Sequence, residues 1–396
     1  MLESSRHITG SNAMTGGQAK WEVPAVGLWG FSHCAFYDSW YPWSGGTFQQ
    51  RLERLTADLV DSGANSFRPH IHWRQVEPLL VASLRTPGDV TGEMVEEYAR
   101  GRSGVDWGRY DMMIDSLVDA GIEPHVVLGA AYDFQVPVLG PGDGRTLAVP
   151  DNLGRDRYLA HVCLHARAAV RRYRGRVKLW QLENELNVAG ETMLFFRWRS
   201  GRSWLDRGFL TALIEVLSRA VRREDPAALT SHNFHTDIRV APGIYDWRKD
   251  VTRWLPLIDV VGVDGYPNYV FGWPSRGHVI GNKVREAVRV SGGRPVMVLE
   301  SGYPVRPRYR GFSEARQAEY APDALLSARQ AGARGFYYYE MCSPEGYPVA
   351  GPWSDRFLQR VEPWWGMVRR DGSRRPAWFA YKRAMTDARE MLTSRS

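Results

Sequence analysis

Short apolar segments alternate with longer amphipathic segments along most of the chain. The apolar segments run for roughly four to eight residues, as buried strands do, and the segments between them repeat apolar residues at helical spacing. The predicted strands are 24–30, 64–69, 122–128, 177–183, 228–233, 258–263, 295–300 and 334–339. The predicted helices are 47–62, 106–120, 151–173, 205–224, 247–256, 276–291, 313–331 and 375–391.

This alternation is typical of parallel strands joined by crossover helices, and eight such pairs predict an α/β protein with a (β/α)8 TIM barrel fold. Gly63, Gly121 and Gly332 each stand shortly before a predicted strand, where a helix is expected to end. Because no shift in composition divides the chain, we predict a single catalytic domain over residues 14–396.

Three stretches are longer than ordinary connections from a strand to the next helix. They cover residues 74–105, 130–150 and 186–204. We therefore expect long βα loops on the C-terminal face of the barrel, which is the face where barrel enzymes carry their active sites.

The first thirteen residues, MLESSRHITGSNA, resemble a leader derived from a cloning vector ahead of Met14. They contain no apolar segment of the kind that a secretory signal requires, so we expect a cytoplasmic protein. No apolar run approaches the roughly 18 residues of a membrane span, so we expect no membrane partner.

The overall composition indicates a folded protein and excludes disordered and fibrous classes, since 44% of residues are hydrophobic and 24% are charged. The net charge is +7, but the 51 basic residues include only five lysines, and the arginines are spread along the whole chain. We therefore expect no nucleic-acid partner. Cys34, Cys163 and Cys342 are too widely spaced for a CxxC metal site, and their odd number favours a reducing compartment.

Aromatic residues are abundant, with 16 Trp, 18 Tyr and 14 Phe, and many lie in segments that contain Gly and Pro. Trp29 and Trp43 belong to one such cluster, and Trp353 belongs to another. Flat rings in loops are suited to stacking on sugar rings or on bases. The alternative is that these loops are packed by their own aromatic side chains.

Two glutamates occupy the positions where a barrel enzyme needs acids. Glu185 follows the predicted fourth strand in WQLENELN, and Glu300 closes the seventh after the apolar run VMVL. A charged residue at the end of an apolar strand is costly unless it is paired or functional. The two positions are 115 residues apart, which spans three βα units and places the side chains across the barrel axis from each other.

Facing carboxyl groups are the machinery of glycoside hydrolysis. One protonates the leaving oxygen while the other attacks the anomeric carbon, when the two lie about 5 Å apart. The same residues could instead bind a divalent cation, but no nearby Asp or His forms a ligand cluster at recognisable spacing. We favour the acid and nucleophile interpretation, and we expect no metal and no cofactor.

The chain resembles the retaining glycoside hydrolases of clan A, whose barrels carry an Asn-Glu pair after strand four and a Glu nucleophile after strand seven. Asn184-Glu185 and Glu300 match these positions. Arg68 in the second strand and Tyr266 in VDGYP extend the similarity, as does the ending WWGMVRRDGSRRPAWFAYK. The resemblance covers nearly the whole chain, and families 5, 39 and 42 are the most similar.

The resemblance implies a retaining β-glycoside hydrolase that cleaves O-glycosidic bonds of a β-linked carbohydrate by double displacement. Glu185 would be the acid/base and Glu300 the nucleophile, and Asn184 would bind the sugar 2-hydroxyl. Arg68 and Tyr266 would keep Glu300 ionised. Apolar walls and the anionic Glu300 should raise the pKa of Glu185.

Several other residues are candidates for substrate binding. His232 and His235, near the fifth strand, could hydrogen-bond the acid/base or a sugar hydroxyl, or be satisfied by the backbone at the barrel rim. His72, two residues after His70, is expected to contact substrate or to be structural, because two histidines without a third ligand are weak evidence for a metal.

The eighth strand departs from the clan, whose members usually place a Trp beneath the scissile sugar. This chain has Tyr337, Tyr338, Tyr339 and Glu340 there. We predict that one of the three tyrosines, with Tyr338 as the candidate, or Trp353 supplies the platform. Glu340 would bind sugar hydroxyls or pair with an arginine. The alternative function is a carbohydrate-binding barrel without turnover, which the carboxylate pair argues against.

Overall fold

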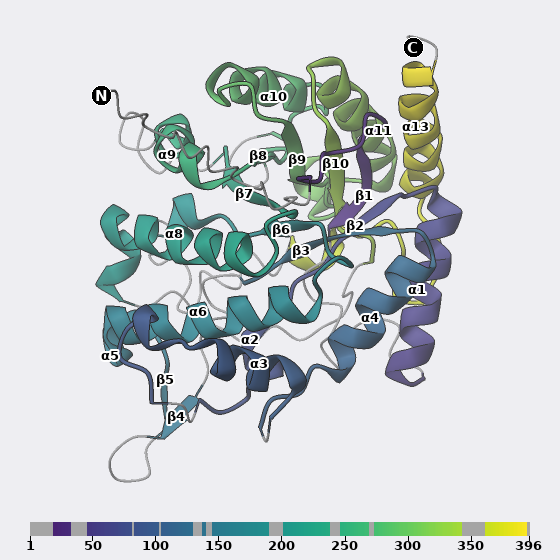
Figure 1. The fold of residues 1–396 in the computed structure, drawn as a ribbon. Coiled ribbons are helices and arrows are strands. Elements are labelled where there is room, and N and C mark those ends of the chain that lie inside the picture. The colour runs from purple at the N-terminus through teal and green to yellow at the C-terminus, as the bar shows by residue number, and fades with distance from the viewer. Residues whose placement is uncertain are drawn as a thin grey trace, which may run out of the picture.

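A closed barrel of parallel strands forms the centre of the protein, as the computed structural model shows (Figure 1). The structure describes residues 19–32, 46–80, 83–102, 104–129, 137–139, 145–189, 201–237, 246–268, 273–342 and 361–393. Within these ranges the strand order around the barrel is β1-β10-β9-β8-β7-β6-β3-β2, and every barrel pairing is parallel. The predicted (β/α)8 barrel is therefore confirmed.

Each barrel strand coincides with one of the predicted apolar segments. The strands are β1 (Leu28–Ser32), β2 (Ser66–Arg68), β3 (Glu123–Val127), β6 (Leu179–Gln181), β7 (Leu229–His235), β8 (Val260–Asp264), β9 (Val296–Ser301) and β10 (Gly335–Tyr339). The first begins four residues later than the predicted 24–30. A turn causes this shift, since the Gly27 N–H donates to the carbonyl of Pro24 at 2.8 Å.

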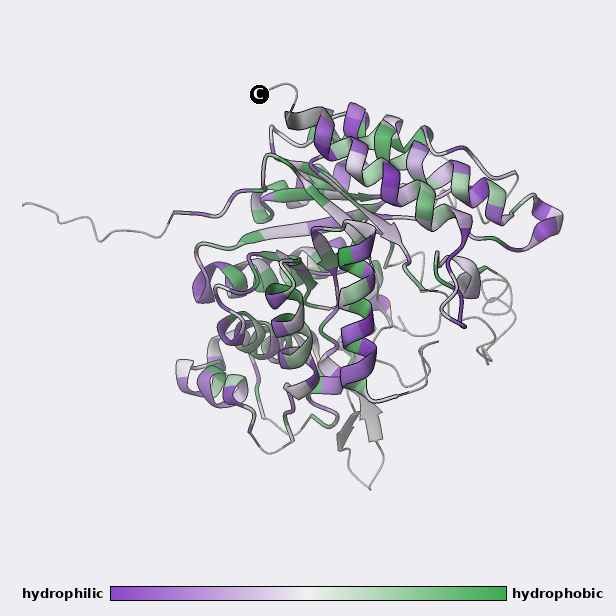
Figure 2. Ribbon diagram, turned by 90° about the vertical axis from the view of Figure 1, so that its right-hand side faces the viewer, coloured by the Kyte–Doolittle hydropathy of each residue, from purple (hydrophilic) through white to green (hydrophobic). Residues whose placement is uncertain are grey.

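The helices between the strands cover the outside of the barrel, as expected. They are α1 (Phe48–Ser62), α4 (Gly108–Asp119), α6 (Arg155–Arg172), α8 (Arg207–Glu224), α9 (Trp247–Trp254), α10 (Val279–Val290), α11 (Glu314–Gln330) and α13 (Pro376–Thr393). Figure 2 shows hydrophilic and hydrophobic segments alternating along these helices. This alternation places an apolar stripe of each helix against the barrel.

The predicted long loops contain secondary structure of their own. The first holds α2 (Trp73–Val76), η1 (Pro87–Asp89) and α3 (Gly92–Arg100), and the second holds the hairpin of β4 (Pro137–Leu139) and β5 (Arg145–Leu147), followed by α5 (Pro150–Leu153). Short 3-10 turns complete the other connections: η2 (Leu186–Val188), η4 (Arg202–Leu205), η5 (Leu255–Leu257), η6 (Arg308–Arg310) and η7 (Glu362–Trp364).

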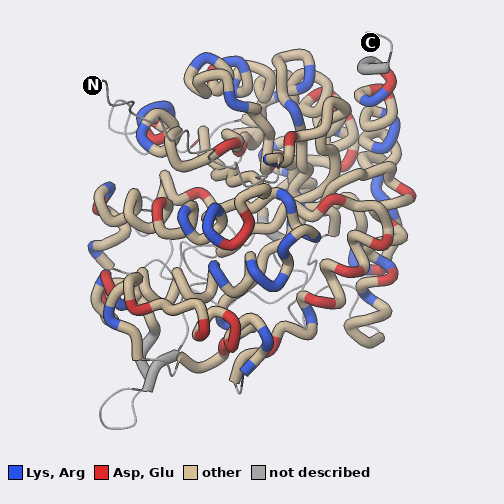
Figure 3. The backbone as a smooth tube through the Cα atoms, in the orientation of Figure 1, with Lys and Arg blue, Asp and Glu red and all other residues tan. Residues whose placement is uncertain are grey.

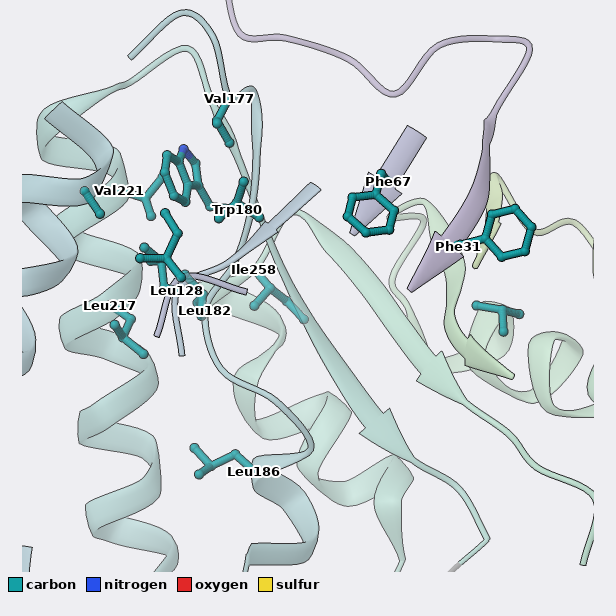
Figure 4. Close-up of a cluster of buried hydrophobic side chains, with 14 of the residues drawn as sticks. Phe31, Phe67, Leu128, Val177, Trp180, Leu182, Leu186, Leu217, Val221 and Ile258 are labelled. Atoms are coloured by element: carbon teal, nitrogen blue, oxygen red, sulfur yellow. The ribbon is translucent and has the colours of Figure 1, made fainter. Parts of the chain in front are cut away.

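The apolar core lies in two places. The larger part fills the space between strands and helices, where Trp180 and Leu182 point toward Leu217 and Val221 of α8 (Figure 4). The smaller part lies inside the barrel and contains residues of six strands, among them Leu179 and Leu229 at the starts of β6 and β7. The interior near the strand ends is polar instead, which leaves room there for a reactive site.

Charged residues of both signs are interspersed over the helices around the barrel (Figure 3). Many form ion pairs at the surface, such as Arg172 with Asp111 and Arg374 with Asp58. Among the described helices, none combines the length and the hydropathy that crossing a bilayer requires.

Candidate active site

Three carboxyl groups meet at the C-terminal end of the barrel. They belong to Glu185, which follows β6, to Asp264, the last residue of β8, and to Glu300 in β9. One carboxylate oxygen from each lies within 4.8 Å of the other two. The topology brings them together because the carboxyl ends of all eight strands open onto the same face.

Glu300 is held by one cation and one hydroxyl. Arg68 Nη1 lies 2.7 Å from its Oε1, and the Tyr266 hydroxyl donates to its Oε2 at 2.6 Å. Burial lowers the pKa of Arg68, but the Glu300 and Asp264 carboxylates outweigh it and hold that pKa above its usual value. The guanidinium therefore stays charged, and one N–H and one O–H donor point at the Glu300 carboxylate.

The Tyr266 hydroxyl remains a donor over the whole accessible pH range. Burial, followed by the charge of Glu300, raises its pKa well above the usual value of a tyrosine. Its ring packs against Trp365 at 5.2 Å between centroids and against Tyr339 at 6.2 Å. These contacts fix the ring and thereby the direction of the hydrogen bond to Glu300.

Glu185 is oriented by an unusual backbone conformation. Its φ of 47° lies in the left-handed region, and among the described residues other than glycine it is alone in having a positive φ. Its N–H donates to Asn233 Oδ1 at 2.9 Å, which holds this conformation. Left-handed non-glycine residues cost on the order of 1–3 kcal/mol and concentrate at functional sites.

The side-chain amide of Asn233 connects several strand ends. Its Oδ1 also accepts from Gln181 Nε2 at 2.7 Å, and its Nδ2 lies 2.8 Å from Asn184 Oδ1 and 2.5 Å from Asp264 Oδ2. Arg68 Nη2 donates to the same Asn184 oxygen at 2.8 Å. Asn184 is thus fixed beside the three carboxyl groups with its amide oxygen already engaged.

His235 is the histidine of β7 that lies near Glu185. Its Nε2 is 3.8 Å from Glu185 Oε1. Burial, with a smaller contribution from Lys283, lowers the pKa of His235 to about 3. The imidazole is therefore neutral at ordinary pH, and it brings no positive charge to the acid group.

The sequence patterns did not point to Asp264 or Asn233. A signal was present for Asn233, because side chains two residues apart on a strand share a face, and Asn233 and His235 both belong to β7. Asp264 ends β8 and Tyr266 lies beyond that strand, so the same rule does not connect these two residues.

Three predicted contacts are wrong, each because the side chain lies on the outer face of its strand. Trp29 is buried in the core between strands and helices, since Ser32, which contacts Arg68, takes the inner face of β1. His232 packs edge-on against Trp254 of α9 at 5.3 Å. The Tyr338 hydroxyl accepts from the backbone N–H of Tyr303 at 3.0 Å.

Of the three tyrosines proposed for the platform, Tyr339 is the one that packs against Tyr266. It also lies 5.9 Å from Trp365 between ring centroids, beside the carboxyl cluster. Glu340 is buried, which raises its pKa well above the usual value, while the positive charge of Arg375 opposes that shift. An attraction to an arginine was one of the two expectations for Glu340.

His72 lies just after β2 and is buried. The His72 ring stacks on that of His70 with 5.7 Å between centroids, and the backbone N–H of His72 donates to the Tyr110 hydroxyl at 2.9 Å. A contact of His72 with substrate stays a prediction. Trp43 and Trp353 fall outside the described residues.

The three carboxylates are also the described residues that could reach one metal ion. Both oxygens of Glu300 already accept hydrogen bonds, from Arg68 and from Tyr266. A cation at this point would lie close to the Arg68 guanidinium and would be repelled by it. The donor set therefore suits protons and a sugar better than it suits a metal.

Comparisons with known proteins support the fold. No family model matches the chain, and no curated protein matches it in sequence. Solved structures do match. The β-glycosidase from Thermosphaera aggregans has a TM-score of 0.64 at 13% identity, covering 93% of this chain and 99% of its own.

Two further structures are similar to a comparable degree. The GH5_18 protein from Streptomyces cattleya, in complex with GlcNAc, has a TM-score of 0.63 at 13% identity, covering 92% of this chain and 80% of its own. An exo-β-1,4-mannosidase from an Opitutaceae bacterium, strain TAV5, has a TM-score of 0.58 at 17% identity. The alignment covers 92% of this chain and 60% of the mannosidase. These TM-scores show that the chain shares the barrel fold with them.

Proposed function

We propose that the protein is a retaining β-glycoside hydrolase, with Glu300 as the nucleophile and Glu185 as the acid/base. The observation that carries the proposal is the carboxylate oxygen of Glu185 lying within 4.8 Å of one from Glu300. Retaining enzymes place these groups about 5 Å apart, whereas inverting enzymes need roughly 6.5–9.5 Å to admit a water molecule. The glycosidases among the similar folds, including the β-glycosidase and the exo-β-1,4-mannosidase, agree with a β-linked substrate.

In the first step the ionised Glu300 attacks the anomeric carbon. The bond from this carbon to the leaving oxygen breaks, and Glu185 gives its proton to that oxygen. Arg68 and Tyr266 direct their N–H and O–H groups at Glu300, so they hold the attacking carboxylate in place. The product of this step is a glycosyl ester of Glu300.

In the second step Glu185 accepts a proton from water, and the water oxygen attacks the anomeric carbon. The ester bond breaks and Glu300 returns to the carboxylate form. Asn184 is positioned to donate its amide N–H to the sugar 2-hydroxyl, because its amide oxygen accepts from Arg68 and from Asn233. A contact of this type strengthens in the transition state and so accelerates both steps.

The test is chemical rescue of the two glutamate variants on a nitrophenyl β-glycoside that the parent enzyme cleaves. Glu300→Ala should abolish turnover, and added azide should yield the α-glycosyl azide. Glu185→Ala should still form the intermediate when the leaving group departs without a proton, and azide should then yield the β-glycosyl azide.

A matched control is Glu123→Ala, which removes a carboxylate at the opposite end of the barrel, where Glu123 pairs with Lys178 at 2.9 Å. This variant should keep the parent's turnover. If Glu300→Ala and Glu185→Ala both retain full activity, or if the anomers are reversed, the assignment is wrong. If the folded parent binds oligosaccharides but cleaves none of a broad β-glycoside panel, the alternative of a binding barrel without turnover is favoured.

A further inference from the structure

Asp264 presents a buried oxygen that no N–H or O–H donor reaches within the described ranges. Its side chain is fully buried, and Asn233 Nδ2 donates to its Oδ2 at 2.5 Å. Its Oδ1 is also buried and has no donor partner. A carboxylate oxygen left in this state is costly, so a proton is the simplest way to satisfy it.

Asp264 would share such a proton with the neighbouring carboxyl group of Glu185. One carboxylate oxygen of Glu185 lies within 4.8 Å of one from Asp264. Ionised carboxylates only accept hydrogen bonds, so a proton held between the two groups would supply the donor that both lack. Glu300 lies within the same 4.8 Å cluster, so three acids crowd a single cavity. Like charges at this separation cannot all be ionised.

Few charges are available to compensate the cluster. Among the described residues, the facing groups are Arg68 from β2, Tyr266 after β8, His235 from β7, and Tyr339 and Glu340 at the end of β10. Of these only Arg68 is cationic. His235 is neutral, and Lys283 farther out pairs with Asp237. One guanidinium against three carboxyl groups favours retention of at least one proton.

We propose that Asp264 and Glu185 share one proton as a dyad, and that Asp264 thereby keeps Glu185 supplied with the proton that the leaving group needs. Asp264 is a positioning residue in this scheme, since it acts through Glu185 and does not touch the substrate. The inference rests on the proposed function, because it assigns the source of the acid proton in the same reaction.

The charge in the cluster balances through the cycle. Before attack Glu300 carries one negative charge and the dyad carries another, with one proton. After the first step Glu300 is a neutral ester, and the dyad has given its proton to the leaving oxygen and carries two charges. Water returns that proton in the second step. The number of carboxylate charges facing Arg68 therefore stays at two throughout.

The electrostatic environment of Asp264 agrees with this geometry. Burial raises the pKa of Asp264 well above its usual value, and the charges of Glu300 and Glu185 raise it further, while Arg68 lowers it. Since each partner of a dyad resists ionisation of the other, the pair releases its second proton only at high pH.

The first test is Asp264→Asn, which keeps the side-chain shape but removes one titrating group. In the parent, the negative charge on one carboxylate of the dyad stabilises the proton on the other. The value of kcat/KM should therefore stay high toward alkaline pH. In Asp264→Asn the alkaline limb of the kcat/KM profile should move to lower pH by about one unit or more. If the alkaline limb lies at the same pH in Asp264→Asn and in the parent, the proposal of a shared proton is overturned.

Asp259→Asn is the matched control, since Asp259 stands just before the same strand at the opposite barrel end, where its Oδ2 accepts from Thr230. This variant should leave the alkaline limb in place. A comparable shift in Asp259→Asn would show that the movement reflects the general charge of the protein, which would overturn the inference.

The second test measures stability and needs no activity. A carboxyl whose pKa is raised on folding contributes stability that is complete below the unfolded value of 3.8 and is lost as pH rises toward the folded value. Asp264→Asn should therefore raise the Tm relative to the parent at pH 7, and the difference should shrink toward pH 4. An equal or lower Tm at pH 7 would refute a proton on Asp264.

A third measurement begins with the unmodified enzyme, so it can refute the proposal even if the variant does not fold. The infrared spectrum at pH 8 should retain the C=O stretch of a protonated carboxyl group, and complete loss of this band would contradict the shared proton. Buried Glu340 can contribute to the same band, so the part that belongs to the dyad is the part that Asp264→Asn loses. If Asp264→Asn loses part of the band but the folded parent cleaves no β-glycoside, the proposed function fails while the proton assignment stands.

Discussion

The hydrogen bond from Tyr266 to Glu300 offers the sharpest quantitative test of the candidate site. Tyr266→Phe removes the hydroxyl that donates to Oε2 at 2.6 Å and keeps the ring that packs on Trp365 and Tyr339. Hydrogen bonds to charged groups contribute about 1.5–3 kcal/mol. The loss of such a bond from a nucleophile should disturb both its position and its charge.

Each 1.36 kcal/mol corresponds to a tenfold change in rate, so Tyr266→Phe should lower kcat by about 10- to 150-fold. The loss of this donor also disfavours negative charge at the site, so the acid limb of the kcat/KM profile on a nitrophenyl β-glycoside should move to higher pH.

Tyr320→Phe is a suitable control. Its hydroxyl lies 3.0 Å from Ser301 Oγ, next to Glu300 in the sequence, and has no contact with the carboxyl cluster in the described structure. This variant should leave kcat and the acid limb unchanged. If Tyr266→Phe behaves like Tyr320→Phe, the hydroxyl does not support the charge on Glu300, and the reasoning about the nucleophile is refuted.

Two further predictions concern stability. Arg68→Met leaves the buried carboxylates of Glu300 and Asp264 without a cation and should destabilise the fold by about 3–5 kcal/mol in urea denaturation, with partial recovery when Glu300→Gln is added. His165 stacks on Trp107 at 5.8 Å, and burial lowers its pKa to about 3 from 6.5, so the unfolded chain binds a proton between these values that the folded chain does not. Stability should fall with decreasing pH by about 1.4 kcal/mol per unit from this residue, and His165→Phe should flatten that slope in denaturation curves at pH 7 and pH 4.

The barrel could be predicted from the sequence because its strands are buried on both faces. Such strands appear as continuous apolar runs between amphipathic helices, and the β9 sequence VMVLES shows this pattern clearly. Because both faces of these strands are buried, the sequence does not show which face each residue takes. His232 and Asn233 are both buried and polar, and alternation alone does not say which of them points to the barrel axis.

The candidate site could be predicted where a charged residue ended an apolar strand, as Glu300 does. Arg68 and Tyr266 followed from the resemblance, and the structure places both on Glu300. Asp264 could not be assigned a role from its position, because its environment depends on Asn233 and Glu185, which come from other strands. Only the three-dimensional arrangement shows that its Oδ1 lacks a donor.

The Asn233 amide has a consequence for how this protein can change its specificity. Its oxygen accepts from Gln181 and from the backbone of Glu185, and its nitrogen donates to Asn184 and Asp264, so one side chain ties the reacting groups to the strands themselves. The described residues of the α2 to α3 connection make none of these four hydrogen bonds. Under the proposed function, exchange of that connection should alter the choice of sugar and leave the arrangement of the carboxyl groups intact. For directed evolution, the rim is the region to randomise, and Asn233 is the residue to leave untouched.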